Sequence, residues 1–330
     1  MEVHCEGCAG CCLDWRSLLD SDDHDGSGSQ HDRRGPRKSG SGGPRREPLD
    51  DDPTFVPLTR DEVRTFLERG MAAAATPRFW HAADESEGVE IDGHTVAAVA
   101  GRPAFFVGLR KPPKPVAPFG RDEETWLPAC VFLDPTTLQC RIHDDGDLFP
   151  GECGAYPEHN LALDQETECE RVEAAFGGDR LVDDSHDEPD GLLLGSQAVG
   201  AKLFCHPEPE RLEGIVDRAA SGDLTAADRA ELVAVAAASS PGTLAVSEHH
   251  YDRAKARALA TNSADDPEEG RADGGAIEET GSDGDWIGPA IREWTERRRR
   301  ADGTVPRSAI AKTIEDARGA PETPGWDAVD

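Results

Sequence analysis

Lysine is scarce in this chain of 330 residues, which contains only six lysines, two tyrosines and two methionines. Arginine supplies the rest of its 35 basic residues, and 66 acidic residues bring the formal net charge to -31. This charge argues against nucleic acid as a general partner, because phosphate binding needs a positive surface field. Repulsion among so many negative charges also destabilises the folded state, and concentrated salt screens this repulsion. We therefore expect a halophilic protein in a salt-rich cytoplasm; the alternative is an acidic protein with disordered tails.

Long apolar runs are also missing. No stretch approaches the roughly 18 apolar residues that a membrane-spanning helix needs. The first residues, MEVHCEGCAGCC, lack the basic start and the apolar run of a signal peptide. We therefore expect a soluble cytoplasmic protein without membrane contact. Because cytoplasmic thiols stay reduced, the nine cysteines indicate metal binding or redox chemistry more than a disulfide framework.

Two polar stretches divide the chain. Residues 20–53 are rich in Gly, Ser, Pro and charge, and cannot bury enough surface to offset their ordering entropy, so we predict a disordered insertion. Residues 261–285 are acidic and Gly-rich, which indicates a disordered linker. The predicted segments are a cysteine-cluster metal-binding domain (1–205), a helical extension (206–260), the acidic linker (261–285) and a C-terminal tail with short helices (286–330).

Local patterns predict both helices and strands. Thr59 with Glu62, and Thr225 with Asp228, have the spacing of helix N-termini. The turn signal Asp92-Gly93 separates two predicted strands, and a further strand covers RPAFFVGL. Helical spacing of apolar residues also marks GLLLGSQAVGAKLF, PERLEGIVDRAAS and SEHHYDRAKARALA, whereas KPPKPVAPFG is expected to be a proline-rich connector. The expected class is α+β: an irregular cysteine-rich domain nucleated by metal, then a helical extension and disordered acidic stretches.

Eight of the nine cysteines fall into two groups. The first is CEGCAGCC, with Cys5, Cys8, Cys11 and Cys12, and the second comprises Cys130, Cys140, Cys153 and Cys169. Two-residue spacing lets a tight loop aim successive sulfurs at one point, as in zinc knuckles and iron–sulfur loops. Four thiolates in eight residues would repel one another without a cation, and a metal favours the thiolate form.

We therefore predict that these eight cysteines bind zinc or iron. The iron could be bound as a 4Fe-4S cluster. Neighbouring side chains of an extended segment point to opposite sides, so Cys11 and Cys12 serve two metals or one of them remains a thiol. Two sites of four thiolates, or one cluster with redox thiols, are both compatible with the spacing. His143 and Cys205 are further candidate ligands, although Cys205 lies in an apolar stretch and is equally well explained as a small core residue.

The same residues resemble a known family. CEGCAGCC matches the CxxCxxCC signature of the YkgJ-type cysteine cluster proteins, and PACVFLDPTTLQCRIHDDGDLFPGECGAYP is similar to the second half of their pattern. The matching positions are Cys130, Phe132, Leu133, Cys140, Ile142, Pro150, Cys153, Tyr156 and Pro157. The resemblance covers about residues 1–175 and implies a zinc- or iron-chelating domain. His143, Phe149 and Gly154 replace a tyrosine and two arginines of the pattern, which puts in doubt an anion-binding role of those arginines here.

The resemblance also extends to an enzymatic branch, the flagellin lysine N-methylases, which carry a similar cysteine domain and whose methylation is expected to use an iron–sulfur cluster. This chain lacks their additional length and shows no recognisable methyl-donor motif, so we lean against an enzyme. A metal-binding module, an iron–sulfur enzyme and a thiol redox protein stay open. Metal ions are the expected partners, and no protein partner is indicated. Arg297–Arg300 is expected to be a solvated helix terminus, with RNA, an acidic partner or the protein's own acidic surface as alternatives.

Overall fold

The computed structural model describes Ala9 and residues 12–14, 47–50, 55–117, 123–143, 145–155, 198–263, 284 and 286–324. These ranges contain helices and antiparallel strands, so the predicted α+β class is confirmed. The chain forms two compact units that each combine separated ranges. Unit 1 comprises Met1–Gly40, Lys111–Asp187 and Ala290–Asp330, and unit 2 comprises Ser41–Arg110 and Glu188–Pro289. Unit 1 thus brings together ranges that the sequence analysis placed in different segments.

Unit 2 contains an antiparallel sheet with the strand order β1-β4-β3-β2, and a short strand β7 also pairs with β4. The strands are β1 (Ala75–Phe79), β2 (Gly88–Ile91), β3 (His94–Val99), β4 (Arg102–Leu109) and β7 (Phe204–Cys205). The predicted turn is confirmed, because Asp92 and Gly93 have φ angles of 54° and 79° and Ile91 pairs with His94. Positive φ at both central residues is what a two-residue hairpin turn of type I′ requires.

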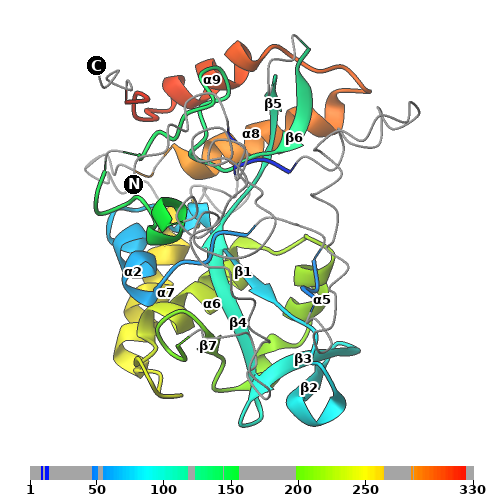
Figure 1. Ribbon diagram of the computed structural model, residues 1–330, viewed down its shortest axis with the longest axis vertical. Coiled ribbons are helices and arrows are strands. Elements are labelled where there is room, and N and C mark those ends of the chain that lie inside the picture. The colour runs from blue at the N-terminus through cyan, green and yellow to red at the C-terminus, as the bar shows by residue number, and fades with distance from the viewer. Residues whose placement is uncertain are drawn as a thin grey trace, which may run out of the picture. The chain divides into compact units, whose positions relative to one another are not determined.

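Helices of unit 2 pack beside this sheet, and Figure 1 shows α2, α6 and α7 gathered next to β1 and β4. The helices are α2 (Arg60–Glu68), α5 (Ile215–Ala220), α6 (Ala226–Ala238) and α7 (Glu248–Ser263), with 3-10 turns η2 (Ala72–Ala74), η3 (Glu85–Glu87) and η4 (Pro209–Leu212). Both predicted N-termini are confirmed as reciprocal capping boxes, at Thr59 and at Thr225. Helix α6 is apolar on nearly every side and is buried accordingly.

One predicted helix is wrong where the structure describes it. Residues 198–204, the end of the expected GLLLGSQAVGAKLF helix, form a turn, a Val199–Leu203 bridge and the first residue of β7. Gly200 explains the difference, since its φ is +73° and a Cβ there would lie 2.2 Å from the carbonyl oxygen of Ser240. A close backbone contact that only glycine permits therefore overrides the helical spacing of the apolar residues.

Unit 1 contains a two-stranded antiparallel sheet of β5 (Pro113–Val116) and β6 (Thr125–Pro128). β5 lies within the expected proline-rich connector, so that connector contains a strand. Helix α8 (Ile287–Arg300) belongs to this unit from Ala290 onward, and α9 (Ser308–Ala317) packs against β5, as Figure 1 shows. Within the described ranges, no helix combines the length and the apolar character that a membrane span requires.

Candidate metal centre

The end of the first cysteine group pairs with the start of the second. The N–H of Cys130 donates to the carbonyl of Cys12 at 2.7 Å, and the N–H of Asp14 donates to the carbonyl of Pro128 at 2.9 Å. This register places Cys12 opposite Cys130, and Cβ atoms of opposite residues lie roughly 4.5–5.5 Å apart on one face of an antiparallel pair. Two thiols at that separation are within reach of one metal ion, whose bond to sulfur is about 2.3 Å long for zinc.

Cys130 and Cys140 belong to a turn that we call the cysteine loop, residues 129–143. Its two limbs are joined by the bridge between Leu133 and Cys140 and by the hydrogen bond from the Arg141 N–H to the Phe132 carbonyl at 2.9 Å. Phe132 and Leu133 are buried in the core, whereas Cys140 is half-buried. The apolar side chains thus anchor the loop and leave the thiol of Cys140 nearer the surface.

The structure describes only some of the cysteines that the sequence predicts as metal ligands. Cys5, Cys8, Cys11 and Cys169 lie outside the described residues. Cys12 and Cys153 are half-buried and Cys130 is buried, while the ring of His143 lies 4.9 Å from that of Phe149. Among the residues that the structure describes, no three His, Cys, Asp or Glu side chains form a group that could hold a metal ion. The donor chemistry of Cys12 and Cys130 nevertheless fits zinc or iron, because both metals are held by soft thiolate sulfur.

Cys205 belongs to unit 2, whereas the cysteine loop belongs to unit 1. It is on β7 opposite Ala104, is 3% exposed, and packs in an apolar cluster with Phe106 and Leu203. Burial raises the pKa of its thiol to about 11. A thiol that stays protonated at neutral pH is a small core side chain, which favours the core interpretation of Cys205 over the ligand interpretation.

A buried ionic network adjoins the cysteine loop, and the sequence analysis did not anticipate it. The side chains of Lys114, Glu315 and Arg141 are fully buried. Glu315 Oε1 lies 2.8 Å from Lys114 Nζ, and Glu315 Oε2 lies 2.7 Å from Arg141 Nη2. Lys114 Nζ also donates to the carbonyls of Val131 and Leu133 at 2.8 and 2.7 Å. The ammonium therefore ties one limb of the loop to helix α9.

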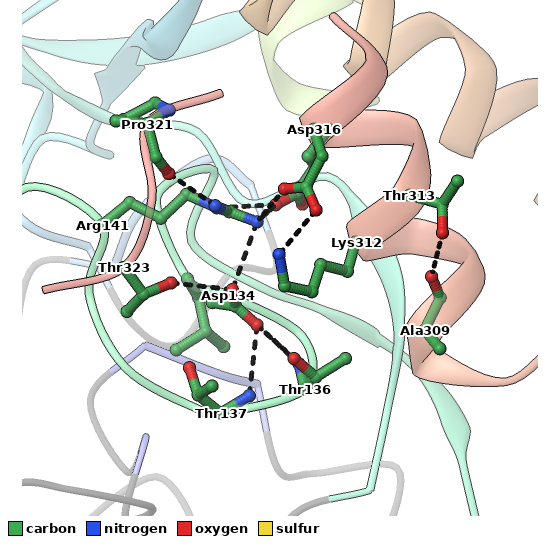
Figure 2. Close-up of polar contacts among 12 residues, drawn as sticks. Asp134, Thr136, Thr137, Arg141, Ala309, Lys312, Thr313, Asp316, Pro321 and Thr323 are labelled. Carbon is green, nitrogen blue, oxygen red and sulfur yellow. Dashed lines mark hydrogen bonds and ion pairs between the residues drawn. The ribbon is translucent and has the colours of Figure 1, made fainter. Parts of the chain in front are cut away.

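Asp134 completes this network from inside the cysteine loop, 3.2 Å from Arg141. It accepts hydrogen bonds from the N–H and the hydroxyl of Thr136, from the N–H of Thr137 and from the hydroxyl of Thr323 (Figure 2). Burial alone would raise the pKa of Asp134, but these hydrogen bonds outweigh it and hold the pKa well below its ordinary value. Asp134 is therefore a carboxylate. The Asp-Pro-Thr-Thr run is the sequence signal that could have indicated this turn.

The C-terminal segment contributes further partners of Arg141. Its Nη1 donates to the carbonyl of Pro321 at 2.6 Å, and its Nη2 lies 3.4 Å from Asp316 on α9. In Figure 2 the Arg141 guanidinium lies between Asp134 and Asp316, and Pro321 lies above it. No local sequence pattern indicates these contacts, because the partners are separated by more than a hundred residues in the chain.

Unit 2 holds a second buried carboxylate, Glu231 on α6. Its Oε1 lies 3.1 Å from His206 Nε2, and its Oε2 accepts hydrogen bonds from Tyr251, Lys255 and Arg211 at 2.6, 2.5 and 3.1 Å. Because His206 Nδ1 accepts the N–H of Glu208, the neutral ring carries its proton on Nε2 and donates it to Glu231. Burial would raise the pKa of Glu231, but these donors lower it to about 2.

This lowered pKa predicts that protonation of Glu231 destabilises unit 2 in acid. The carboxylate contributes fully above its ordinary pKa of 4.5, and its contribution is lost as the pH falls through about 2. The difference corresponds to about 3 kcal/mol. We expect the free energy of unfolding, measured by urea titration between pH 7 and 3, to fall less steeply for Glu231→Gln than for the wild type below pH 4.5. Two parallel pH profiles would contradict this assignment.

Together these features define an α+β protein in which Cys12 pairs with Cys130 beside a buried ionic network. The chain belongs to the family described as "Family of unknown function (DUF7531)", whose model matches residues 1–327. No curated protein matches the chain, and no solved structure matches it. Because the family description carries no activity, the function must be argued from the residues themselves.

Proposed function

We propose that this protein binds zinc or iron, the latter singly or as a 4Fe-4S cluster, through its cysteine groups. The ligands in this proposal are Cys5, Cys8, Cys11, Cys12, Cys130, Cys140, Cys153 and Cys169, with His143 as a further candidate. The observation that carries the proposal is the pairing of Cys12 with Cys130, since it supports a meeting of the CxxCxxCC run with the second cysteine group. The resemblance to YkgJ-type cysteine cluster proteins supports the same chemistry from the sequence.

The residues around this pairing would keep the two thiols together. Leu13 and Ala129, which form the bridge between the two segments, are both fully buried. Their burial holds the segments in one register, so Cys12 and Cys130 keep facing the same side. Bound zinc would link the two segments as a structural ion, whereas an iron–sulfur cluster would supply electron transfer. The proposal places the protein in the cytoplasm, where thiols remain reduced.

Elemental analysis combined with an absorption spectrum tests this proposal. The protein should be purified without oxygen and in high salt, because thiolates oxidise and the chain carries a charge of -31. Zinc at about one or two ions per chain would identify a structural site of closed tetrahedra. Iron with acid-labile sulfide and a visible band that bleaches on reduction would identify a cluster. A colourless protein without metal, whose thiols oxidise reversibly, would contradict the proposal and favour a redox protein.

A further inference from the structure

We infer that Glu315 on α9 is a positioning residue that sets how the cysteine loop presents Cys130 and Cys140. This inference rests on the proposed metal function and deepens it. In this inference helix α9 supports the metal site, although Glu315 follows Cys140 by 175 positions in the chain.

One carboxylate controls both limbs of the loop. On the limb that carries Cys130, Glu315 acts through Lys114, whose Nζ donates to the carbonyls of Val131 and Leu133. On the limb that carries Cys140, Glu315 accepts directly from the next residue, Arg141, at 2.8 Å from its Nε. The spacing between the two limbs is therefore tied to a single side chain of α9.

The link between Glu315 and the cysteine loop depends on the negative charge of Glu315. Among the fully buried side chains of the network, Lys114 and Arg141 carry two positive charges, and Asp134 and Glu315 carry two negative charges. Without the Glu315 charge, Arg141 would keep Asp134 and Asp316, but the buried Lys114 would lose the carboxylate with which it pairs, which is costly in a low-dielectric interior. Lys114 also lies 4.6 Å from the ring centroid of Trp294. Once the Glu315 charge is lost, the link from the ammonium to α9 is weakened, so the limb that carries Cys130 is held less firmly.

Glu315→Gln tests the inference because it preserves shape and removes the charge. The probe is cobalt(II), which occupies thiolate sites and reports sulfur ligation through a charge-transfer band. We expect Glu315→Gln to bind cobalt(II) about 10- to 100-fold more weakly than the wild type, the usual effect of losing a group that supports metal ligands. A second readout needs no metal: the alkylation rate of Cys130 and Cys140 in the metal-free protein should rise.

Glu231→Gln is the matched control, because it also neutralises a buried carboxylate that is paired with more than one basic side chain, but in unit 2. Both variants are compared at a temperature at which circular dichroism shows them folded. The control should be less stable than the wild type yet show wild-type cobalt(II) affinity and wild-type alkylation rates. If Glu315 only stabilised the fold, the two variants would show the same cobalt(II) affinity and the same alkylation rates.

The outcomes separate this inference from the proposed function. If the wild type binds cobalt(II) and Glu315→Gln matches it in affinity, spectrum and alkylation, the inference fails and the proposed function stands. Equal weakening in Glu315→Gln and Glu231→Gln also overturns it, because general destabilisation would then be the cause. If the wild type binds no cobalt(II) and also contains neither zinc nor iron as purified, the proposed function fails. Faster alkylation in Glu315→Gln alone would then still support a positioning role, and unchanged alkylation would overturn it.

Discussion

Cys130→Ser is expected to abolish stoichiometric metal binding, whereas Cys205→Ser should retain it. Both residues are buried cysteines, 7% and 3% exposed, and both receive the same single-atom change. Cys130 lies opposite Cys12, where its thiolate can bind the proposed metal, but Cys205 packs among apolar side chains with a pKa of about 11. A serine hydroxyl is a poor substitute for thiolate sulfur, so the first change removes a ligand and the second changes only the packing.

The measurement is metal content per chain, together with the free energy of unfolding. Cys8→Ser, within the CxxCxxCC run, should resemble Cys130→Ser in losing metal, and this loss should lower the free energy of unfolding of the cysteine-containing part of the chain. Cys205→Ser should cost about 1–3 kcal/mol, because it buries a hydroxyl in an apolar cluster. Equal metal content in the wild type, Cys130→Ser and Cys8→Ser would overturn the ligand assignment.

Lys114→Met is expected to lower the free energy of unfolding by about 3–5 kcal/mol, since it removes one of the two buried cations that pair with Glu315 and leaves the buried network with an unbalanced negative charge. Lys114 has no exposed surface, pairs with Glu315 at 2.8 Å and donates to two loop carbonyls. Methionine fills much of the same volume, so lost charge and hydrogen bonding dominate over a cavity. Urea denaturation of the metal-free protein measures this loss without involving the proposed metal.

Lys312→Met is the matched control in the same unit. Lys312 pairs with Asp316 at 2.5 Å on α9, but the two side chains are 35% and 45% exposed. Exposed pairs of this kind are worth about 0.2–1 kcal/mol, so the control should lose much less stability. In Lys114→Met combined with Glu315→Gln the two losses should not add, because both changes remove the same interaction. Similar losses for Lys114→Met and Lys312→Met would contradict the role assigned to the buried network.

Features that depend on a few neighbouring residues were predictable. The capping boxes at Thr59 and Thr225 join residues three positions apart, and the Asp92-Gly93 turn needs only residues that tolerate positive φ. The predictions failed where a distant segment decides the local structure. The apolar residues around Gly200 have helical spacing but form no helix, because the backbone of Ser240 lies close to Gly200. The spacing of apolar residues cannot reveal this contact.

The candidate site divides in the same way. The sequence by itself determined which residues are the candidate donors, because CxxCxxCC and the later cysteines are thiols whose spacing suits zinc or iron. Only the tertiary structure decided that Cys12 faces Cys130, that Cys205 is a core residue, and that α9 is tied to the cysteine loop. The physical reason is distance along the chain: spacing and turn chemistry report on neighbours, whereas pairing and burial depend on which remote segments fold together.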